Sequence, residues 1–315
     1  MTDAIVFPGQ GSQAPRMAAG WLDHPAWDLV RRAEQILDRP LGHFLLDADR
    51  APTATRDVQL CVVLTSLMGW QAVRPLVGRP AVFAGHSLGQ VTALAAAGVI
   101  GFEDLVRLVD QRGATTSDAC RQHGGGMVAV LGLPVEQVTW ACAAAHGQCW
   151  VANDNAPGQA VLGGTHAGLA RVVARARDLG ARKILPLQVE GPFHTPLMLP
   201  AVWRFGAYAR GLDYSAPSAP ILSNADAALI RSGSWGWRLT EHLIAPVRWR
   251  QSQLRMVRSG IGRIIEIGYG TTLTSIARRT VPERIELVNI DGPAALAVLA
   301  PAPRRREPVP AGVAR

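Results

Sequence analysis

A serine flanked by glycines is the first feature of this sequence that could do chemistry. Residues 85–89 (GHSLG) match the G-x-S-x-G pattern of a nucleophile elbow, between a short apolar run at 81–84 and an alanine-rich run at 90–97. A strand, a tight turn and a helix in this order would project the Ser87 hydroxyl and aim the N–H of Leu88 at a developing oxyanion. The pattern predicts acyl transfer through an acyl-serine, and an ordinary glycine-bracketed turn is the alternative.

Two distant segments contain the partners that such a serine needs. Residues 7–13 (FPGQGSQ) follow the apolar run 4–7, and a backbone N–H from a loop after another strand is the usual second donor of an oxyanion hole. Residues 191–198 (GPFHTPLM) contain His194, and a serine hydroxyl needs a base, most often histidine, at neutral pH. Taken alone, the first segment could be a simple turn and His194 a structural histidine.

Together these segments resemble the malonyl-CoA:acyl carrier protein transacylases, a family that includes the acyltransferase domains of polyketide synthases. That family carries GQGSQ near its N-terminus, GHSxG around its serine and FH in a later loop. The resemblance keeps its order from about Ile5 to about Arg279, which is more specific than any single motif. Five more segments share it: 111–113 (QRG), 155–159 (NAPGQ), 222–224 (LSN), 246–249 (PVRW) and 266–270 (EIGYG).

The resemblance implies a two-step ping-pong reaction. Ser87 would attack the thioester of malonyl-CoA while His194 takes its proton, and His194 would later deprotonate the phosphopantetheine thiol of an acyl carrier protein. The oxyanion is expected between the backbone N–H groups of Gln10 and Leu88. Serine hydrolases orient their base with an Asp, whereas this family uses a main-chain carbonyl, which is that of His242 here.

The family also implies which residues bind the substrate. Arg112 would form a bidentate pair with the free malonyl carboxylate, because a planar guanidinium matches a carboxylate and stays charged when dry. A surface arginine on the amphipathic helix expected at 102–119 is the alternative. Phe193 would close the pocket beside the α-carbon and favour malonyl over methylmalonyl. The expected substrate-binding set is Arg112, Phe193, His86, Gln13 and Asn155.

Two residues depart from the family pattern. Gln90 stands where the family often has Glu, and Tyr269 replaces the proline of a Gly-Pro-Gly turn. Neither is expected to touch the chemistry. They bear on the subfamily, on the shape of the entrance and, through it, on the acyl specificity.

Three other functions fit parts of the pattern. An editing hydrolase that strips acyl groups from carrier proteins would use the same serine and histidine, but it gains nothing from Arg112. A carrier-to-carrier acyltransferase would keep Arg112 for another dicarboxylic unit. A non-catalytic carrier-binding subunit would not need Ser87 and His194.

The elements around these motifs predict an α/β fold. Short apolar runs indicate buried parallel strands, and a long apolar run indicates a buried helix. We expect an α/β-hydrolase-like large domain with a parallel sheet core, formed by residues 1–124 and 190–300. Its main predicted elements are strands 4–7, 81–84, 220–223, 263–267 and 285–290, and helix 58–73.

A different order of elements separates the middle of the chain. After the glycines at 124–126, the pattern reads β-α-β-β-α-β, which predicts an inserted ferredoxin-like subdomain at 125–189. A turn-rich loop is expected at 153–158. Residues 301–315 are rich in Pro, Arg and Ala and are expected to be a disordered tail. The subdomain's predicted strands are 127–131, 149–152, 160–162 and 182–189, and its helices 134–145 and 166–179.

Composition and charge narrow the partners. The chain has 315 residues, 48% of them hydrophobic, and a formal net charge of +8, which fits an anionic partner such as a phosphate-bearing coenzyme or an acidic carrier protein. The basic residues are scattered, so no nucleic-acid partner is expected. Candidates for carrier contact, with solvated surface charge as the alternative, are Arg182, Arg248, Arg278 and Arg279.

The remaining features predict a cytoplasmic enzyme. There is no basic N-terminal region and no apolar run of about 18 residues, so neither a signal peptide nor a membrane span is expected. The four cysteines form no CxxC pair, which indicates reduced thiols and no metal site. Coenzyme A is expected as the substrate's carrier and no bound cofactor is implied. Family members are often monomeric, and the pathway is fatty acid or polyketide synthesis.

Overall fold

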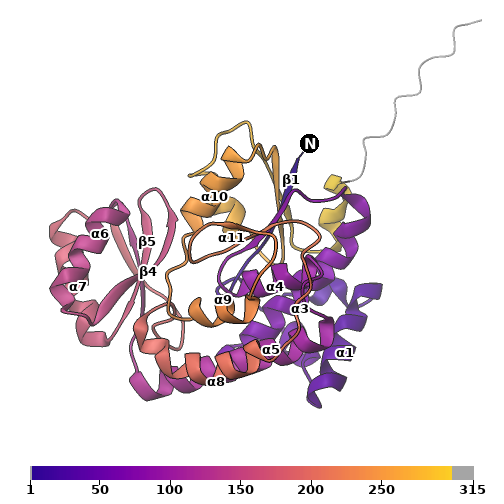
Figure 1. Ribbon diagram of the computed structural model, residues 1–315, viewed down its shortest axis with the longest axis horizontal. Helices are drawn as coiled ribbons and strands as arrows, with labels where there is room; N and C mark the ends of the chain where they lie inside the picture. Colours follow the sequence, from indigo (N-terminus) through magenta and orange to yellow (C-terminus); the bar gives the residue numbers. More distant parts are fainter. Residues whose placement is uncertain (1, 300–315) are drawn as a thin grey trace, which may run out of the picture.

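Two separate β-sheets organise the chain in the computed structural model, which describes residues 2–299 (Figure 1). The disordered tail predicted at 301–315 lies outside the described residues. The larger sheet has six strands in the order β10-β9-β1-β2-β7-β8. These strands are β1 (Asp3–Phe7), β2 (Val82–Gly85), β7 (Ile221–Leu222), β8 (Leu229–Ile230), β9 (Arg263–Ile267) and β10 (Glu286–Ile290).

The centre of this sheet is parallel, as predicted, and β8 runs antiparallel to β7 at one edge, which makes the sheet mixed. Every residue of β1 and β2 is buried, as expected for strands covered by helices on both faces. Phe7 pairs with Gly85, so these two strands end side by side. The loops that follow them, which carry two of the predicted motifs, therefore begin as neighbours.

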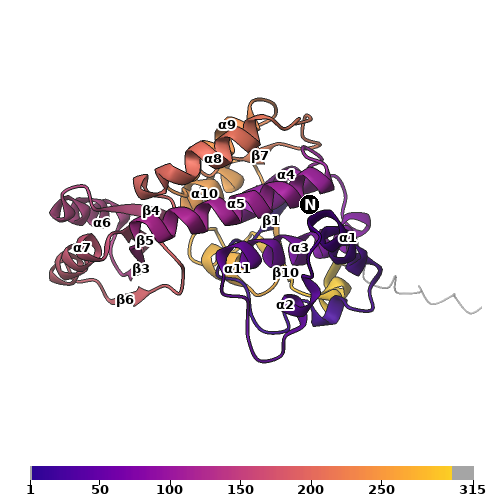
Figure 2. The same ribbon diagram turned by 90° about the horizontal axis from the view of Figure 1, so that it is seen from below.

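Helices cover both faces of the six-stranded sheet. The predicted buried helix is α3, and α5 runs from the large sheet out to the second sheet (Figure 2). None of the helices described in residues 2–299 combines the length and apolar character that crossing a membrane requires. The helices are α1 (Asp28–Leu37), α2 (Gly42–Leu46), α3 (Thr55–Val73), α4 (Leu88–Ala96), α5 (Phe102–His123), α8 (Leu199–Arg210), α9 (Trp235–Glu241), α10 (Trp249–Arg258) and α11 (Thr272–Ala277). Short 3-10 turns lie at Ala19–Trp21, Pro25–Trp27, Arg74–Leu76, Ala143–Ala145, Pro196–Met198 and Pro293–Leu299.

The second sheet is antiparallel throughout and has the order β4-β5-β3-β6. Two helices pack on one face through their own apolar core, which includes Val130, Val138 and Val172 (left side of Figure 1). The opposite face carries a smaller apolar cluster that reaches Phe193. The elements are β3 (Gly126–Leu131), α6 (Val135–Cys142), β4 (Cys149–Ala156), β5 (Gln159–Gly164), α7 (His166–Asp178) and β6 (Lys183–Pro186).

The prediction of a loop at 153–158 is wrong. Strand β4 continues to Ala156 and turns directly into β5. Asn and Asp favour turns, but here β5 pairs with one edge of the segment and Asn153 forms a bridge with Val247 on the other. The strand predicted at 182–189 is shorter than expected, and α8 was not predicted. Pro200 stands in the first turn of α8, where a helix tolerates it.

Polar contacts join the second sheet to the large sheet's helices. The Asp154 carboxylate accepts hydrogen bonds from Arg250 Nε at 2.9 Å and Gln251 Nε2 at 2.9 Å. Gln253 Nε2 donates to the Asn155 carbonyl at 3.0 Å. Because Asp154 is almost fully buried, these bonds fix the end of β4 against α10.

Candidate active site

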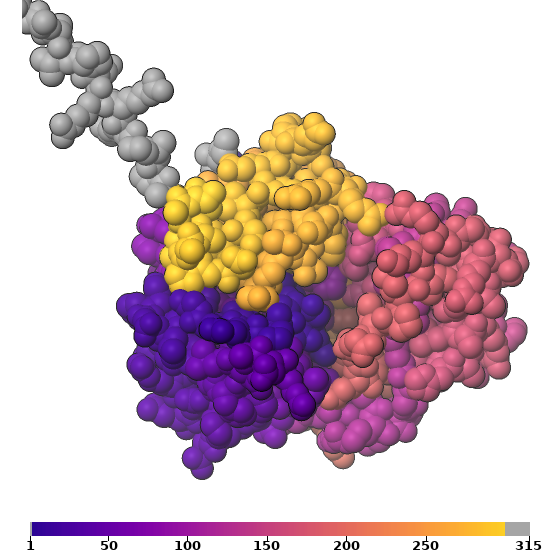
Figure 3. Space-filling view, turned by 180° about the vertical axis from the view of Figure 1, so that it is seen from behind, coloured from indigo at the N-terminus to yellow at the C-terminus, as the bar shows by residue number. Residues whose placement is uncertain are grey.

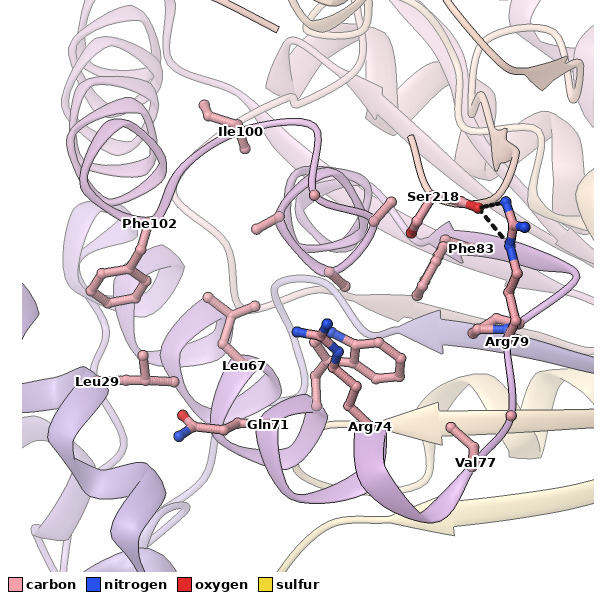
Figure 4. A pocket seen from close by; sticks show the side chains of 17 residues that line it. Leu29, Leu67, Gln71, Arg74, Val77, Arg79, Phe83, Ile100, Phe102 and Ser218 are labelled. Carbon is pink, nitrogen blue, oxygen red and sulfur yellow. Dashed lines mark hydrogen bonds between the residues drawn. The ribbon is translucent and has the colours of Figure 1, made fainter. Parts of the chain in front are cut away.

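Two cavities lie at opposite ends of α4. The larger, about 620 Å³, lies beside the C-terminal end of α4, and Figure 4 shows Leu67, Phe83 and Arg74 among the residues that line it. Arg79 there donates to the Ser218 carbonyl. The lining of this cavity, as the structure describes it, contains no His, Cys, Asp or Glu, so no side chain there could act as general base for a hydroxyl group. The smaller cavity, about 230 Å³, lies at the N-terminal end of α4.

The smaller cavity is lined by residues of several segments, among them the loop after β1, the face of the second sheet opposite its helices, and α11. The space-filling view from behind shows a recess where these parts meet (Figure 3). Most of the predicted site residues line this cavity: Gln10, His86, Ser87, Leu88, Arg112, Asn155, Phe193 and His194.

Two predicted residues stand outside the lining. Gln13 is not a wall of the cavity; its Oε1 accepts the N–H of Gly11 at 2.7 Å and so shapes the turn after β1. His242 lies behind His194, and its buried side chain has Nε2 without a hydrogen-bond partner in residues 2–299. The part of His242 that contacts His194 is its carbonyl group.

The turn at Ser87 has the strained geometry of a nucleophile elbow. Ser87 has φ 51° and ψ −108°, a conformation that costs a non-glycine residue about 1–3 kcal/mol. The flanking glycines are required by space. A Cβ on Gly85 would lie 2.0 Å from the Gly89 carbonyl carbon, and one on Gly89 would lie 2.1 Å from the Phe7 oxygen. The spacing of glycines in the motif thus follows from the contact between the elbow, α4 and β1.

Ser87 and His194 are in direct contact. Ser87 Oγ lies 2.6 Å from His194 Nε2. On the other side of the ring, Nδ1 lies 2.9 Å from the His242 carbonyl oxygen and 3.2 Å from that of Ala245. Since carbonyl oxygens only accept hydrogen bonds, they place the ring proton on Nδ1 and leave Nε2 free to accept the serine proton. The Ala245 carbonyl was not predicted from the sequence.

The surroundings keep His194 in its basic form. Burial and, after it, the positive charge of Arg112 lower its pKa to about 3. The imidazole is therefore neutral at pH 7 and can take a proton from the serine. The pKa of His86 and that of His242 are also lowered, chiefly by burial.

Because the pKa values of these three histidines are lowered in the folded protein, we expect the protein to lose stability in mild acid. Below about pH 6.5 the unfolded chain takes up protons that the folded chain excludes, so the free energy of unfolding falls by up to about 1.4 kcal/mol per pH unit for each histidine. Urea unfolding at pH 7.5 and 5.5 measures the slope of the unfolding free energy against pH. A His242→Leu variant should have a shallower slope and a variant of exposed His123, His123→Leu, the wild-type slope. Equal slopes in all three proteins would contradict the assignment.

Two of the residues that line the cavity beside Ser87 have backbone N–H groups that are unpaired in the described part of the chain. Those of Gln10 and Leu88 donate to no acceptor within residues 2–299. The two segments meet at Gly9, where a Cβ would lie 2.4 Å from the His86 oxygen and 3.6 Å from the Leu88 nitrogen. A pair of unpaired donors next to a nucleophile is the arrangement that stabilises a tetrahedral oxyanion.

Arg112 brings a buried positive charge to the same cavity. Its side chain lies in the cavity wall, the residue is 6% exposed, and it forms no ion pair or side-chain hydrogen bond within residues 2–299. Burial lowers its pKa to about 10, so the guanidinium remains protonated at neutral pH. A dry unpaired charge is costly, which indicates that an anion completes this site.

Gln59 is a cavity residue that the sequence reasoning missed. It comes from α3, is 1% exposed, and its Oε1 has no hydrogen-bond partner in the described chain. The available signal was a glutamine inside the otherwise apolar run 58–73. A buried amide oxygen without a donor indicates a second polar contact for a ligand in this cavity.

The two departures from the family pattern lie away from the lining. Gln90 is 1% exposed, and its Oε1 accepts the backbone N–H of Asn224 at 2.6 Å. A carboxylate oxygen could accept the same bond, so Gln in place of Glu preserves this contact. Tyr269 packs against the large hydrophobic core. His86 and Asn155, by contrast, form part of the wall, with His86 Nε2 2.8 Å from Asn155 Oδ1.

Comparisons with known proteins agree with the motifs. The acyl transferase domain family matches residues 4–293. A malonyl CoA-acyl carrier protein transacylase of Salmonella typhimurium is 34% identical over 307 residues, covering 93% of this chain and 97% of the relative. An acyl-carrier-protein S-malonyltransferase structure from Burkholderia pseudomallei has a TM-score of 0.90 and 32% identity, covering 95% of this chain and 99% of that chain. A malonyl-transacylase in complex with its type II PKS acyl-carrier protein has a TM-score of 0.89 and 31% identity, covering 95% and 99%.

Proposed function

This chain belongs to the acyl transferase domain family, and from that premise we propose that it moves a malonyl group from malonyl-CoA to the phosphopantetheine thiol of an acyl carrier protein. One observation carries the proposal. The cavity that holds the Ser87–His194 pair also holds Arg112, a buried cation with no anionic partner in residues 2–299. A malonyl group supplies a thioester carbonyl for the serine and a carboxylate for the guanidinium.

In the first half-reaction, Ser87 Oγ bonds to the thioester carbonyl carbon as its proton moves to His194 Nε2. The N–H groups of Gln10 and Leu88 would stabilise the oxyanion of the tetrahedral intermediate. The intermediate collapses when the carbon–sulfur bond breaks, and coenzyme A leaves as a thiol with the proton from His194. The product is malonyl-Ser87, held by Arg112.

In the second half-reaction, the carrier's thiol gives its proton to His194 and its sulfur attacks the malonyl-Ser87 carbonyl. The ester bond breaks, Ser87 Oγ regains the proton, and the malonyl group leaves as a thioester of the carrier. Coenzyme A enters as part of the substrate, and none of these steps calls on a metal or a bound cofactor.

The proposed site for the carrier is the rim of the cavity near the β4–β5 turn. Arg279, which follows α11, donates to the Pro157 carbonyl at 2.9 Å and to Gln159 Oε1 at 2.8 Å. Gln159 itself lines the cavity. An exposed arginine at this position suits the acidic surface of a carrier protein and the phosphate of its prosthetic group.

We propose an α/β-hydrolase-like large domain and a ferredoxin-like small one, at residues 125–189. The elements β3, α6, β4, β5, α7 and β6 follow one another in the β-α-β-β-α-β order. The antiparallel order β4-β5-β3-β6 puts the first and third strands in the middle, which supports the same description.

Intact-mass spectrometry tests the function. The protein is mixed separately with malonyl-CoA, methylmalonyl-CoA and acetyl-CoA, and then with a carrier bearing phosphopantetheine. We expect one malonyl adduct, far less of the other two, and removal of the adduct by the carrier faster than by water. Phe193 lines the cavity, and we expect less methylmalonyl adduct because this side chain would close the space beside the substrate's α-carbon. Release to water at the carrier's rate would indicate an editing hydrolase, and a dominant acetyl adduct would contradict the role of Arg112.

A further inference from the structure

We propose that Asn224 is a positioning residue whose side chain replaces a missing strand partner and holds the Ser87 elbow in its reactive shape. This assignment rests on Ser87 acting as the nucleophile of the proposed function. Asn224 is fully buried and does not line the cavity, so it acts through the elbow and not on the substrate.

The carboxamide of Asn224 bonds to the backbone on both sides of His86. Its Oδ1 accepts the N–H of Ser87 at 2.7 Å, and its Nδ2 donates to the carbonyl of Gly85 at 2.8 Å. The backbone of Asn224 is held elsewhere. Its N–H donates to Gln90 Oε1 at 2.6 Å, and its carbonyl accepts the N–H of Arg248 at 2.8 Å. Asn224 is thus held by four hydrogen bonds, two made by its side chain and two by its backbone.

These two bonds have the pattern of a parallel β-ladder. In such a ladder a residue donates to the carbonyl before its partner and accepts from the N–H after it. Strand β2 pairs with β7 through Phe83 and Ile221, and continuing that register by three residues places His86 opposite Asn224. The chain has already turned away at Asn224, so a side-chain amide makes the two bonds that a peptide would make.

The use of a side chain in place of a strand partner matters because β2 must end in a strained turn. On the β1 side the end of β2 is held by the N–H of His86, which donates to the Phe7 carbonyl at 3.0 Å. On the β7 side it is held by the two hydrogen bonds of the Asn224 side chain. With both edges fixed, the peptide before Ser87 cannot rotate, so the Ser87 hydroxyl stays toward His194 and the N–H of Leu88 stays toward the cavity.

An Asn224→Ala variant tests the assignment. We expect kcat for malonyl transfer to fall about 10²-fold, because small displacements of reacting groups cost about that much, while KM changes by less than about threefold. Asn224 does not line the cavity and forms no hydrogen bond with Arg112, so substrate binding should persist. The matched control is Asn289→Ala, which also removes an asparagine bonded to a backbone carbonyl, that of Gly270 at 2.6 Å. We expect this control variant to lose a similar free energy of unfolding in urea and to have an unchanged kcat.

A second reaction separates this proposal from the proposed function. An alkyl fluorophosphonate needs no malonyl site: Ser87 Oγ bonds to phosphorus, fluoride leaves, and His194 takes the proton. We expect Asn224→Ala to slow this labelling about as much as it slows malonyl transfer. Equal labelling rates in the variant and wild type would overturn the role of Asn224. A wild type that reacts with the fluorophosphonate but not with malonyl-CoA would instead overturn the proposed function.

Asn224→Asp covers the case in which the alanine variant does not fold. The carboxyl group has the same shape as the amide, but an ionised carboxylate cannot donate to the Gly85 carbonyl. We expect a folded protein in which both reactions are at least about tenfold slower than in the wild type. Wild-type rates in this variant would show that the bond to Gly85 does not position the elbow.

Discussion

A Ser87→Ala variant is expected to take up no malonyl group from malonyl-CoA and to pass none to a carrier protein. Alanine keeps the turn but removes the atom to which the acyl group would bond. His194 then has no hydroxyl at 2.6 Å from which to take a proton. Intact-mass spectrometry after mixing with malonyl-CoA measures the adduct directly, and assays with a loaded carrier measure the transfer.

Two further variants show whether the loss is specific. Ser218→Ala changes the serine of the larger cavity, where no base is present, and should leave labelling unchanged. His194→Ala keeps the serine but removes its base, so labelling should persist and slow by about 10²–10⁴. Complete malonyl labelling of the Ser87→Ala protein would show that another group carries the acyl chain and would reject the site.

The elements around the serine could be predicted because local rules determine them. A buried strand, a glycine-bracketed turn and an alanine-rich segment follow one another at 81–97, and the structure has β2, the elbow and α4 there. Helix α3 was equally clear as a long apolar run. The family suggested by the collinear motifs is confirmed by the match to residues 4–293.

The contacts that complete the site could not be predicted from the local sequence. Ser87 and His194 are 107 residues apart, and their pairing was implied by the family and not by spacing. Asn224 reads as an ordinary turn residue after a strand, because a sequence does not show that β7 ends early. The extension of β4 was missed for a related reason: Asn153 and Asp154 favour turns, and the partners that keep them in a strand are distant.

An Arg112→Met variant is expected to shift the enzyme's preference away from malonyl groups and toward acetyl groups. In the proposed function a malonyl carboxylate pairs with the buried Arg112 guanidinium, and losing one partner of such a pair costs about 2–5 kcal/mol. The kcat/KM for malonyl-CoA should therefore fall at least about 30-fold. Acetyl-CoA should gain, because a bound acetyl group no longer leaves a desolvated charge without a partner.

The ratio of the two kcat/KM values is the decisive measurement, because misfolding would lower both. Arg107→Met is the control: Arg107 lies on the same helix, α5, but is exposed and paired with Glu103. It should leave the ratio unchanged. Arg112→Lys retains the charge without the planar fork, so it should recover only part of the malonyl activity. If Arg112→Met lowered both substrates equally, the arginine would support the fold of the cavity and would not read the carboxylate.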